Sequence, residues 1–187
     1  MKKQNKKIIT TKVLANCALL AALSVVLARL IAVMPNESTR FSIEAIPIFL
    51  AGMLFGPIPG AMVGFAADFV GSLFSGYGYN PIFCVPPILY GLSAGLFRYY
   101  LCAKPNLLRI TLGWLPPVLL GSVLYQSATL AWVYGKGLFF ENFVMRLGLR
   151  IPQFAVTLVL DVLIVFFLCK TSIFKRMGLW PERKETT

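Results

Sequence analysis

The sequence contains no histidine, and its four cysteines are isolated from one another. Cys17, Cys84, Cys102 and Cys169 lie singly within or beside apolar stretches, and no Cys-x-x-Cys pair occurs. Zinc sites and dithiol redox centres need clustered Cys or His ligands. The sequence therefore predicts no metal site and no cofactor, and the cysteines are explained as small apolar side chains.

Catalytic motifs are missing as well. A Ser-His-Asp set and an HExxH zinc site both require histidine, and no Gly-rich loop ends in Gly-Lys-Ser or Gly-Lys-Thr. We therefore predict no catalytic residue and no enzymatic activity. Any ATP-driven step would have to be supplied by another subunit.

Charged residues are scarce, at 13% of the 187 residues, whereas hydrophobic residues make up 58%. A soluble domain has about 25% charged and roughly 45–50% apolar residues. Several apolar segments approach the ~20 residues that a helix needs to cross a bilayer. The composition therefore predicts an all-α polytopic membrane protein that forms one domain over residues 1–187.

The basic residues are distributed unevenly between the two sides of the predicted bundle. Most lie before the first apolar run at 2–12, in the connection at 98–109, or after the last run at 170–184. Only Arg40 and Lys136 fall in the loops on the other side. Cytoplasmic loops carry an excess of Lys and Arg, so both termini are expected in the cytoplasm of a multi-pass plasma-membrane protein. This placement accounts for the net charge of +11, so nucleic-acid binding is not needed to explain it.

The hydrophobic pattern predicts six helices, at about 10–34, 43–55, 59–75, 82–101, 109–134 and 142–169. The segment at 43–55 is too short to cross a bilayer upright. The tight, uncharged turn Gly-Pro-Ile-Pro-Gly at 56–60 predicts that this segment and the next pack as an antiparallel hairpin.

Small residues recur four positions apart in two of these segments. Ala18 with Ala22 shows this spacing in the first, and Gly91 with Gly95 shows it in the fourth. Such spacing lets helix backbones approach closely in lipid. It is compatible with packing inside the bundle and with docking of another membrane protein, and spacing alone does not decide between them.

Polar side chains at membrane depth indicate a binding cavity, because each is costly there. Arg146, Arg150 and Gln153 share one helix face, and further polar and aromatic residues are expected at a similar depth. One interpretation is structural, with Arg29 paired to Asp68 and Arg146 reaching the surface. The other is an anion-binding cavity open to the outside. Its candidate ligand-binding residues are Arg29, Arg40, Asp68, Tyr77, Tyr79, Asn80, Phe83, Tyr125, Gln126, Arg146, Arg150 and Gln153.

Four stretches carry a resemblance to a known family. Residues 40–48 (RFSIEAIPI) and 50–57 (LAGMLFGP) resemble the second-helix region of S components, the substrate-binding subunits of energy-coupling factor (ECF) vitamin transporters. Residues 18–24 (ALLAALS) are similar to the AxxxA pattern with which S components dock on their transmembrane subunit. Residues 60–71, with Ala67-Asp68, resemble the folate branch.

The resemblance implies a binding subunit that captures folate outside the cell. It further implies partners: a transmembrane coupling subunit, which Ala18 and Ala22 would contact, and two cytoplasmic ATPases. Folate combines a flat pterin with a dianionic glutamate, so at least one of Arg146 and Arg150 is assigned to the glutamate. Asp68 and Asn80 are assigned to the pterin.

Three alternatives stay open at this point. The chain could be an S component for another vitamin or precursor, such as thiamine or pantothenate, although cationic thiamine suits an arginine-rich site poorly. It could be a proton-coupled small-molecule carrier, which would transport without partners. It could also be a membrane scaffold without a ligand, whose buried polar residues only hold helices together.

Overall fold

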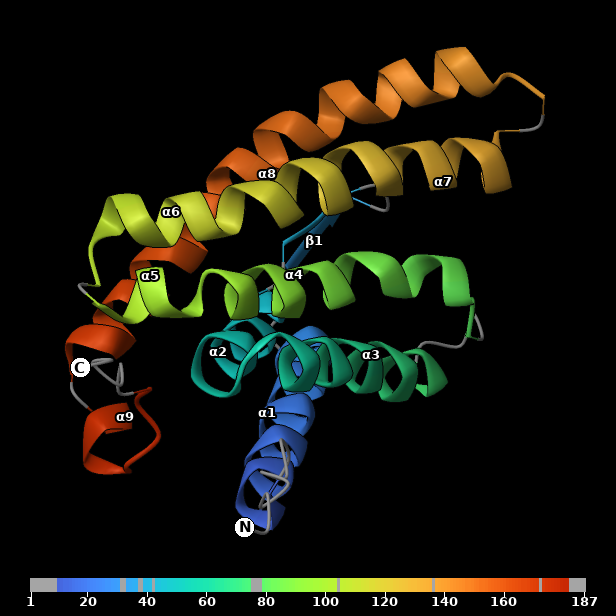
Figure 1. Cartoon of the computed structure of the whole chain (residues 1–187). Helices are drawn as coiled ribbons and strands as arrows, with labels where there is room; N and C mark the ends of the chain where they lie inside the picture. Colours follow the sequence, from blue (N-terminus) through green and yellow to red (C-terminus); the bar gives the residue numbers. More distant parts are fainter. Residues whose placement is uncertain are drawn as a thin grey trace, which may run out of the picture.

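The computed structural model describes residues 10–30, 33–36, 39–41, 43–74, 79–103, 105–135, 137–171 and 173–181. Its elements, in chain order, are α1 (Thr11–Leu30), β1 (Val33–Asn36), β2 (Thr39–Phe41), α2 (Ala45–Phe55), α3 (Pro57–Leu73), η1 (Pro81–Cys84), α4 (Val85–Leu96), α5 (Arg98–Ala103), α6 (Leu107–Pro116), η2 (Pro117–Tyr125), α7 (Gln126–Tyr134), α8 (Phe139–Lys170) and α9 (Ile173–Arg176). The described chain is helical apart from one short hairpin (Figure 1).

Within these ranges, three helices are long and apolar enough to cross a membrane: Thr11–Arg29, Leu107–Tyr134 and Phe139–Lys170. Three shorter apolar helices accompany them, at Ala45–Phe55, Pro57–Leu73 and Pro81–Leu96. Lipid-facing side chains explain the many exposed large hydrophobics, such as Leu19, Leu108 and Trp132. The chain is therefore a helical membrane protein.

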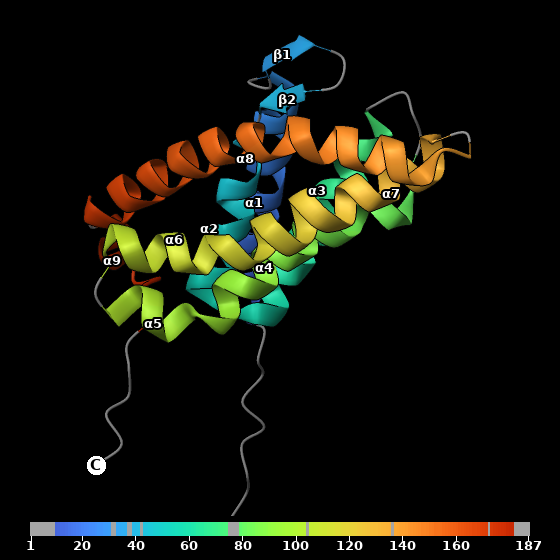
Figure 2. The same cartoon turned by 90° about the horizontal axis from the view of Figure 1, so that it is seen from above.

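The first helix is shorter than the sequence indicated. The predicted span 10–34 ends at Leu30, and residues 33–36 form a strand paired antiparallel with β2. A proline at position 35 lacks the backbone N–H that a continuing helix requires. The expected loop at 35–42 thus contains a hairpin, which lies at one end of the molecule beside α8 (Figure 2).

Two other predicted helices are interrupted. The predicted span 82–101 is divided into η1, α4 and α5, with Pro86 and Pro87 in the first turn of α4, where their missing N–H groups cost nothing. The predicted span 109–134 contains the π-helical segment η2, which begins at Pro117 directly after Pro116. Because neither proline donates a backbone hydrogen bond, the regular α-helical ladder changes there.

Helices α2, α3 and α4 are held together by direct backbone contact at glycines. A Cβ atom on Gly91 of α4 would overlap the carbonyl of Gly60 in α3, and one on Gly95 would overlap the backbone of Pro57. A Cβ on Gly52 of α2 would overlap the carbonyl of Gly91. The four-residue spacing of Gly91 and Gly95 therefore serves packing inside the bundle. We call α2, α3 and α4 the glycine-packed layer.

An aromatic cluster joins the glycine-packed layer to the second half of the chain. The ring of Trp114 in α6 stacks on Phe49 of α2 at 4.4 Å between centroids and meets Tyr90 of α4 edge-on at 5.1 Å. Ser93 of α4 donates a 2.9 Å hydrogen bond to the carbonyl of Gly113. Since Trp114 is fully buried, α6 and the following η2 are fixed relative to α2 and α4.

We predict that Gly91→Ala destabilises the isolated protein in detergent. The added methyl group meets a backbone carbonyl that no rotamer change can move, and overpacking of this kind costs about 1–3 kcal/mol. The matched control is Gly148→Ala in α8, where a Cβ has open space and alanine favours the helix. Thermal unfolding should show a lowered midpoint for Gly91→Ala only. Equal midpoints for both variants would show that α3 and α4 are not in backbone contact.

Candidate functional site

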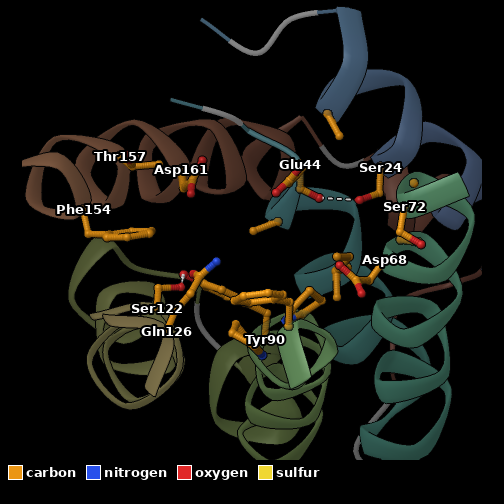
Figure 3. A pocket seen from close by; sticks show the side chains of 18 of the residues that line it. Ser24, Glu44, Asp68, Ser72, Tyr90, Ser122, Gln126, Phe154, Thr157 and Asp161 are labelled. Carbon is orange, nitrogen blue, oxygen red and sulfur yellow. Dashed lines mark hydrogen bonds between the residues drawn. The ribbon is translucent and has the colours of Figure 1, made fainter. Parts of the chain in front are cut away.

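A cavity of about 420 Å³ lies between two groups of helices. One wall comes from α1 and the glycine-packed layer, and the other from η2, α7 and α8 (Figure 3). Its volume falls in the range of about 300–1,000 Å³ that is typical of small-molecule sites. The polar and charged residues that line it are Ser24, Arg29, Glu44, Asp68, Ser72, Asn80, Tyr90, Ser122, Gln126, Tyr134, Arg150, Gln153, Thr157 and Asp161.

Arg150 is positioned in the cavity wall by neutral oxygens. Its Nη1 atom donates to the carbonyl of Ser122 at 2.9 Å and to Oε1 of Gln126 at 3.0 Å. The guanidinium carbon lies 5.8 Å from the ring centroid of Phe154, one turn further along α8. Among the described residues, no carboxylate forms an ion pair with Arg150. Its positive charge is therefore held in place without being neutralised.

The π-helical segment η2 provides one of these acceptors. A π-helix shifts the backbone hydrogen bonds from residue i−4 to residue i−5. Accordingly, the N–H of Gln126 bonds to the carbonyl of Gly121 instead of that of Ser122. The Ser122 carbonyl is the group that accepts from Arg150. The two prolines that start η2 thus contribute indirectly to placing the arginine.

Two hydrogen-bonded hydroxyl groups, the hydroxyl pair, line the part of the cavity next to η2. Tyr90 and Ser122 are hydrogen-bonded through their hydroxyl oxygens at 2.9 Å, and both are buried. Because the ring of Tyr90 also packs against Trp114, the hydroxyl pair is anchored to the aromatic cluster. The pair links the two walls of the cavity and limits their separation.

Two acidic side chains, Asp161 of α8 and Glu44 before α2, lie on one side of the cavity (Figure 3). Asp161 is only 3% exposed, and its Oδ1 atom has no hydrogen-bond partner. The carbonyl of Glu44 accepts a 2.6 Å hydrogen bond from Ser24 of α1. The sequence prediction omitted both residues from the site, although an acidic residue inside an apolar segment is itself the signal that could have included them.

Arg29 and Asp68 lie on the α1 and α3 side of the cavity. Arg29 donates through Nη2 to the carbonyl of Gly71. The carboxyl of Asp68 interacts with the thiol of Cys84 and, more weakly, with the charge of Arg29. A direct Arg29–Asp68 ion pair, which the structural interpretation of the sequence required, is absent from the described residues.

Comparisons with known proteins place the chain in a family. Residues 8–170 match the profile of the family described as "ECF-type riboflavin transporter, S component". The chain belongs to this family. It is a subunit of a vitamin transporter.

Among solved structures, this S component is similar to one titled "Crystal structure of FolT bound with folic acid". The TM-score is 0.74 at 28% sequence identity, over 87% of this chain and 95% of the other. No curated protein sequence matched the chain. The family description and the solved structure therefore name different vitamins, riboflavin and folic acid.

The S component's cavity brings together most of the residues that the sequence singled out. Those that line it are Arg29, Asp68, Asn80, Phe83, Gln126, Arg150 and Gln153. Asn80 also accepts a 3.1 Å hydrogen bond from the backbone N–H of Ile82 and so caps η1. Tyr77 and the side chain of Arg40 lie outside the described residues.

Three other candidates lie outside the lining. The hydroxyl of Tyr125 donates to the carbonyl of Ile82 at 3.1 Å, which ties η2 to η1. Tyr79 packs edge-on against Phe69 at 5.0 Å. Arg146 is half-buried one turn before Arg150, with an Nε atom that has no hydrogen-bond partner. Equal helical spacing thus did not give Arg146 and Arg150 the same surroundings.

Ala18 and Ala22 are exposed on α1, and neither lines the cavity. Leu14, Leu19 and Leu23 are exposed beside them, and Leu19 is 66% exposed. Ser24 of the same helix is buried and lines the cavity. We call the exposed surface around Ala18 and Ala22 the α1 outer face.

Proposed function

We propose that this S component binds folate in the cavity between the glycine-packed layer and α8, and delivers it to an ATP-driven coupling module. The observation that carries the proposal is Arg150, a cavity-lining guanidinium whose hydrogen bonds end on neutral oxygens. A guanidinium in an apolar bundle is costly unless an anion or water faces it. The glutamate tail of folate supplies carboxylates, which match the planar donor fork of arginine.

The likeness to a folate-bound structure supports the same vitamin. The likeness covers 87% of this chain and 95% of the other, which supports a similar bundle around the cavity. The flat pterin also suits the aromatic residues of the lining, Phe83, Tyr90 and Phe154. Folate therefore suits the aromatic lining of the cavity and the charge of Arg150, and it is the ligand named for the similar solved structure.

Riboflavin is a second candidate, because the matching family is described by that vitamin. Its isoalloxazine ring is flat like a pterin, and its ribityl chain offers hydroxyl groups. Riboflavin carries no carboxylate, however, and leaves the charge of Arg150 without a counterpart. The two vitamins can thus be distinguished by one measurement of how binding depends on the negative charge of the ligand.

We further propose that residues 1–187 form one domain with six membrane-crossing segments. An even number of crossings puts both termini on the same side of the plasma membrane, and the excess of Lys and Arg on that side would make it the cytoplasmic one. The short helices α2, α3 and α4 would cross as parts of the bundle, supported by their glycine contacts. The partners are a transmembrane coupling subunit and two cytoplasmic ATPases, so this chain binds its ligand and performs no catalysis itself.

We predict that Arg150→Ala weakens folic acid binding to the purified chain. Loss of hydrogen bonds to a charged group costs roughly 1.5–3 kcal/mol, or about 10- to 150-fold in Kd. Arg146→Ala, one turn away and outside the cavity lining, is the matched control and should leave Kd nearly unchanged. Isothermal titration in detergent measures both.

The ligand provides a second control for Arg150. Folic acid dimethyl ester has the same shape without the glutamate charges, so Arg150→Ala should change its affinity little. Equal losses for the acid and the diester would show that Arg150 maintains the cavity and does not bind carboxylate. Tight riboflavin binding by the unchanged chain, with no binding of folic acid, would replace the first candidate by the second.

We predict that Ala18→Trp with Ala22→Trp abolishes vitamin uptake by the assembled transporter and preserves ligand binding by the isolated chain. Neither alanine lines the cavity, and two indoles on the α1 outer face would prevent close approach of a partner helix. Co-purification with the coupling subunit tests assembly, and titration tests binding. Leu108→Trp, at an exposed position of α6, is the control for a bulky residue facing lipid. Loss of binding with assembly retained would place the alanine pair next to the site.

A further inference from the structure

We propose that Asp161 is the specificity-determining residue of the cavity and accepts hydrogen bonds from the paired N–H donors of the pterin. This role rests on the proposed function and concerns which edge of the ligand's heterocycle the cavity selects. A carboxylate in this position would favour a heterocycle whose facing edge carries two N–H donors. It would disfavour a heterocycle whose facing edge presents carbonyl oxygens.

The Oδ1 atom of Asp161 is buried without a hydrogen-bond partner. The side chain is 3% exposed, lines the cavity and has an Oδ1 atom without a partner. Nearby hydroxyls are already engaged, because Thr157 donates to the carbonyl of Gln153 at 2.9 Å and Tyr90 is paired with Ser122. The charged group that acts on Asp161 is Glu44, which is also acidic and offers no donor when ionised. A buried carboxyl group without donors is costly, so a donor from the ligand would be favourable.

Asp161 and Arg150 occupy different positions along the cavity wall. Both line the cavity from α8, and they are about three turns apart, which is roughly 16 Å along a helix. An anion-binding group and an acceptor group thus stand at separate places along one wall. Folate has the matching order, with glutamate carboxylates at one end and pterin N–H donors at the other, joined by an aminobenzoyl group.

The two candidate vitamins differ in their pattern of hydrogen-bond donors. Pterin presents its 2-amino group and the N3–H side by side, and a carboxylate can accept both with its two oxygens. The isoalloxazine ring of riboflavin presents one N–H between two carbonyl oxygens. A carboxylate facing that edge gains one hydrogen bond and is repelled by the carbonyl oxygens, so Asp161 would discriminate against riboflavin.

Asp68, which the sequence assigned to the pterin, is less suited to this role. Its carboxyl already has the thiol of Cys84 as a hydrogen-bonding neighbour, and it is only half-buried. An acceptor with existing partners has less to gain from a ligand donor than the unpartnered Oδ1 atom of Asp161. Figure 3 shows the two residues on different sides of the cavity.

The test begins with the unchanged chain and two ligands. Folic acid and 2-desamino folic acid differ only in the 2-amino group, one of the two donors from which Asp161 would accept hydrogen bonds. Titration should give about 10- to 150-fold weaker binding of the desamino compound. Equal affinities overturn the assignment of Asp161 and leave folate binding intact. Absence of folic acid binding overturns the proposed function instead, together with this inference.

The variant Asp161→Asn completes the test. It should weaken folic acid by a similar factor, reduce the preference over the desamino compound to near one, and reduce the preference of folic acid over riboflavin at least tenfold. The matched control is Glu141→Gln, the same change at an exposed position of the same helix, which should alter none of these ratios. A variant that keeps the preference for folic acid over the desamino compound refutes the role of Asp161. If Asp161→Asn does not fold, the two-ligand comparison on the unchanged chain decides alone.

Discussion

Backbone contact at glycines within the glycine-packed layer is the constraint on which the rest of the structure depends. In lipid, apolar side chains gain nothing by leaving their surroundings, so helices associate through close packing and weak polar contacts. Gly52, Gly60 and Gly91 leave no room for a Cβ where α2, α3 and α4 cross. The short helix α2 is thereby held by its neighbours over nearly its whole surface, and residues 46–54 are buried.

The cavity lies beside this layer, with η2, α7 and α8 on its other side. The aromatic cluster around Trp114 joins the layer to α6, and Tyr90 of that cluster also lines the cavity. The cavity is lined by polar groups that would be unfavourable against lipid. Arg150 is held by neutral acceptors and Asp161 has an unpartnered oxygen, so both are prepared for a ligand with complementary groups at its two ends.

Helix irregularities contribute to this preparation. Proline residues at 116 and 117 convert the middle of a long helix into η2, which releases the Ser122 carbonyl toward Arg150. Prolines in the first turn of α4 set where that helix begins, and Asn80 caps the turn before it. Arg150 and Asn80 are therefore positioned beside backbone segments where regular α-helical hydrogen bonding stops.

The sequence by itself determined the class of protein and the class of site. Scarce charge, long apolar segments and the placement of Lys and Arg are properties of composition and order along the chain, and they require no knowledge of which helices touch. Motifs at 40–57 carried the family resemblance for the same reason. Arg150 could be nominated because a buried arginine is rare in lipid wherever its neighbours lie.

Only the tertiary structure decided which of the nominated residues share one cavity. Helical periodicity put Arg146 and Arg150 on one face, but a cavity has a finite extent along that face, and only Arg150 reaches Ser122 and Gln126. The spacing of Gly91 and Gly95 was ambiguous until Gly60 and Pro57 were seen against them. Glu44 and Asp161 are far apart in the sequence and meet the same space because α2 and α8 pack together. Such relations depend on contacts between distant segments, which local patterns of residues do not encode.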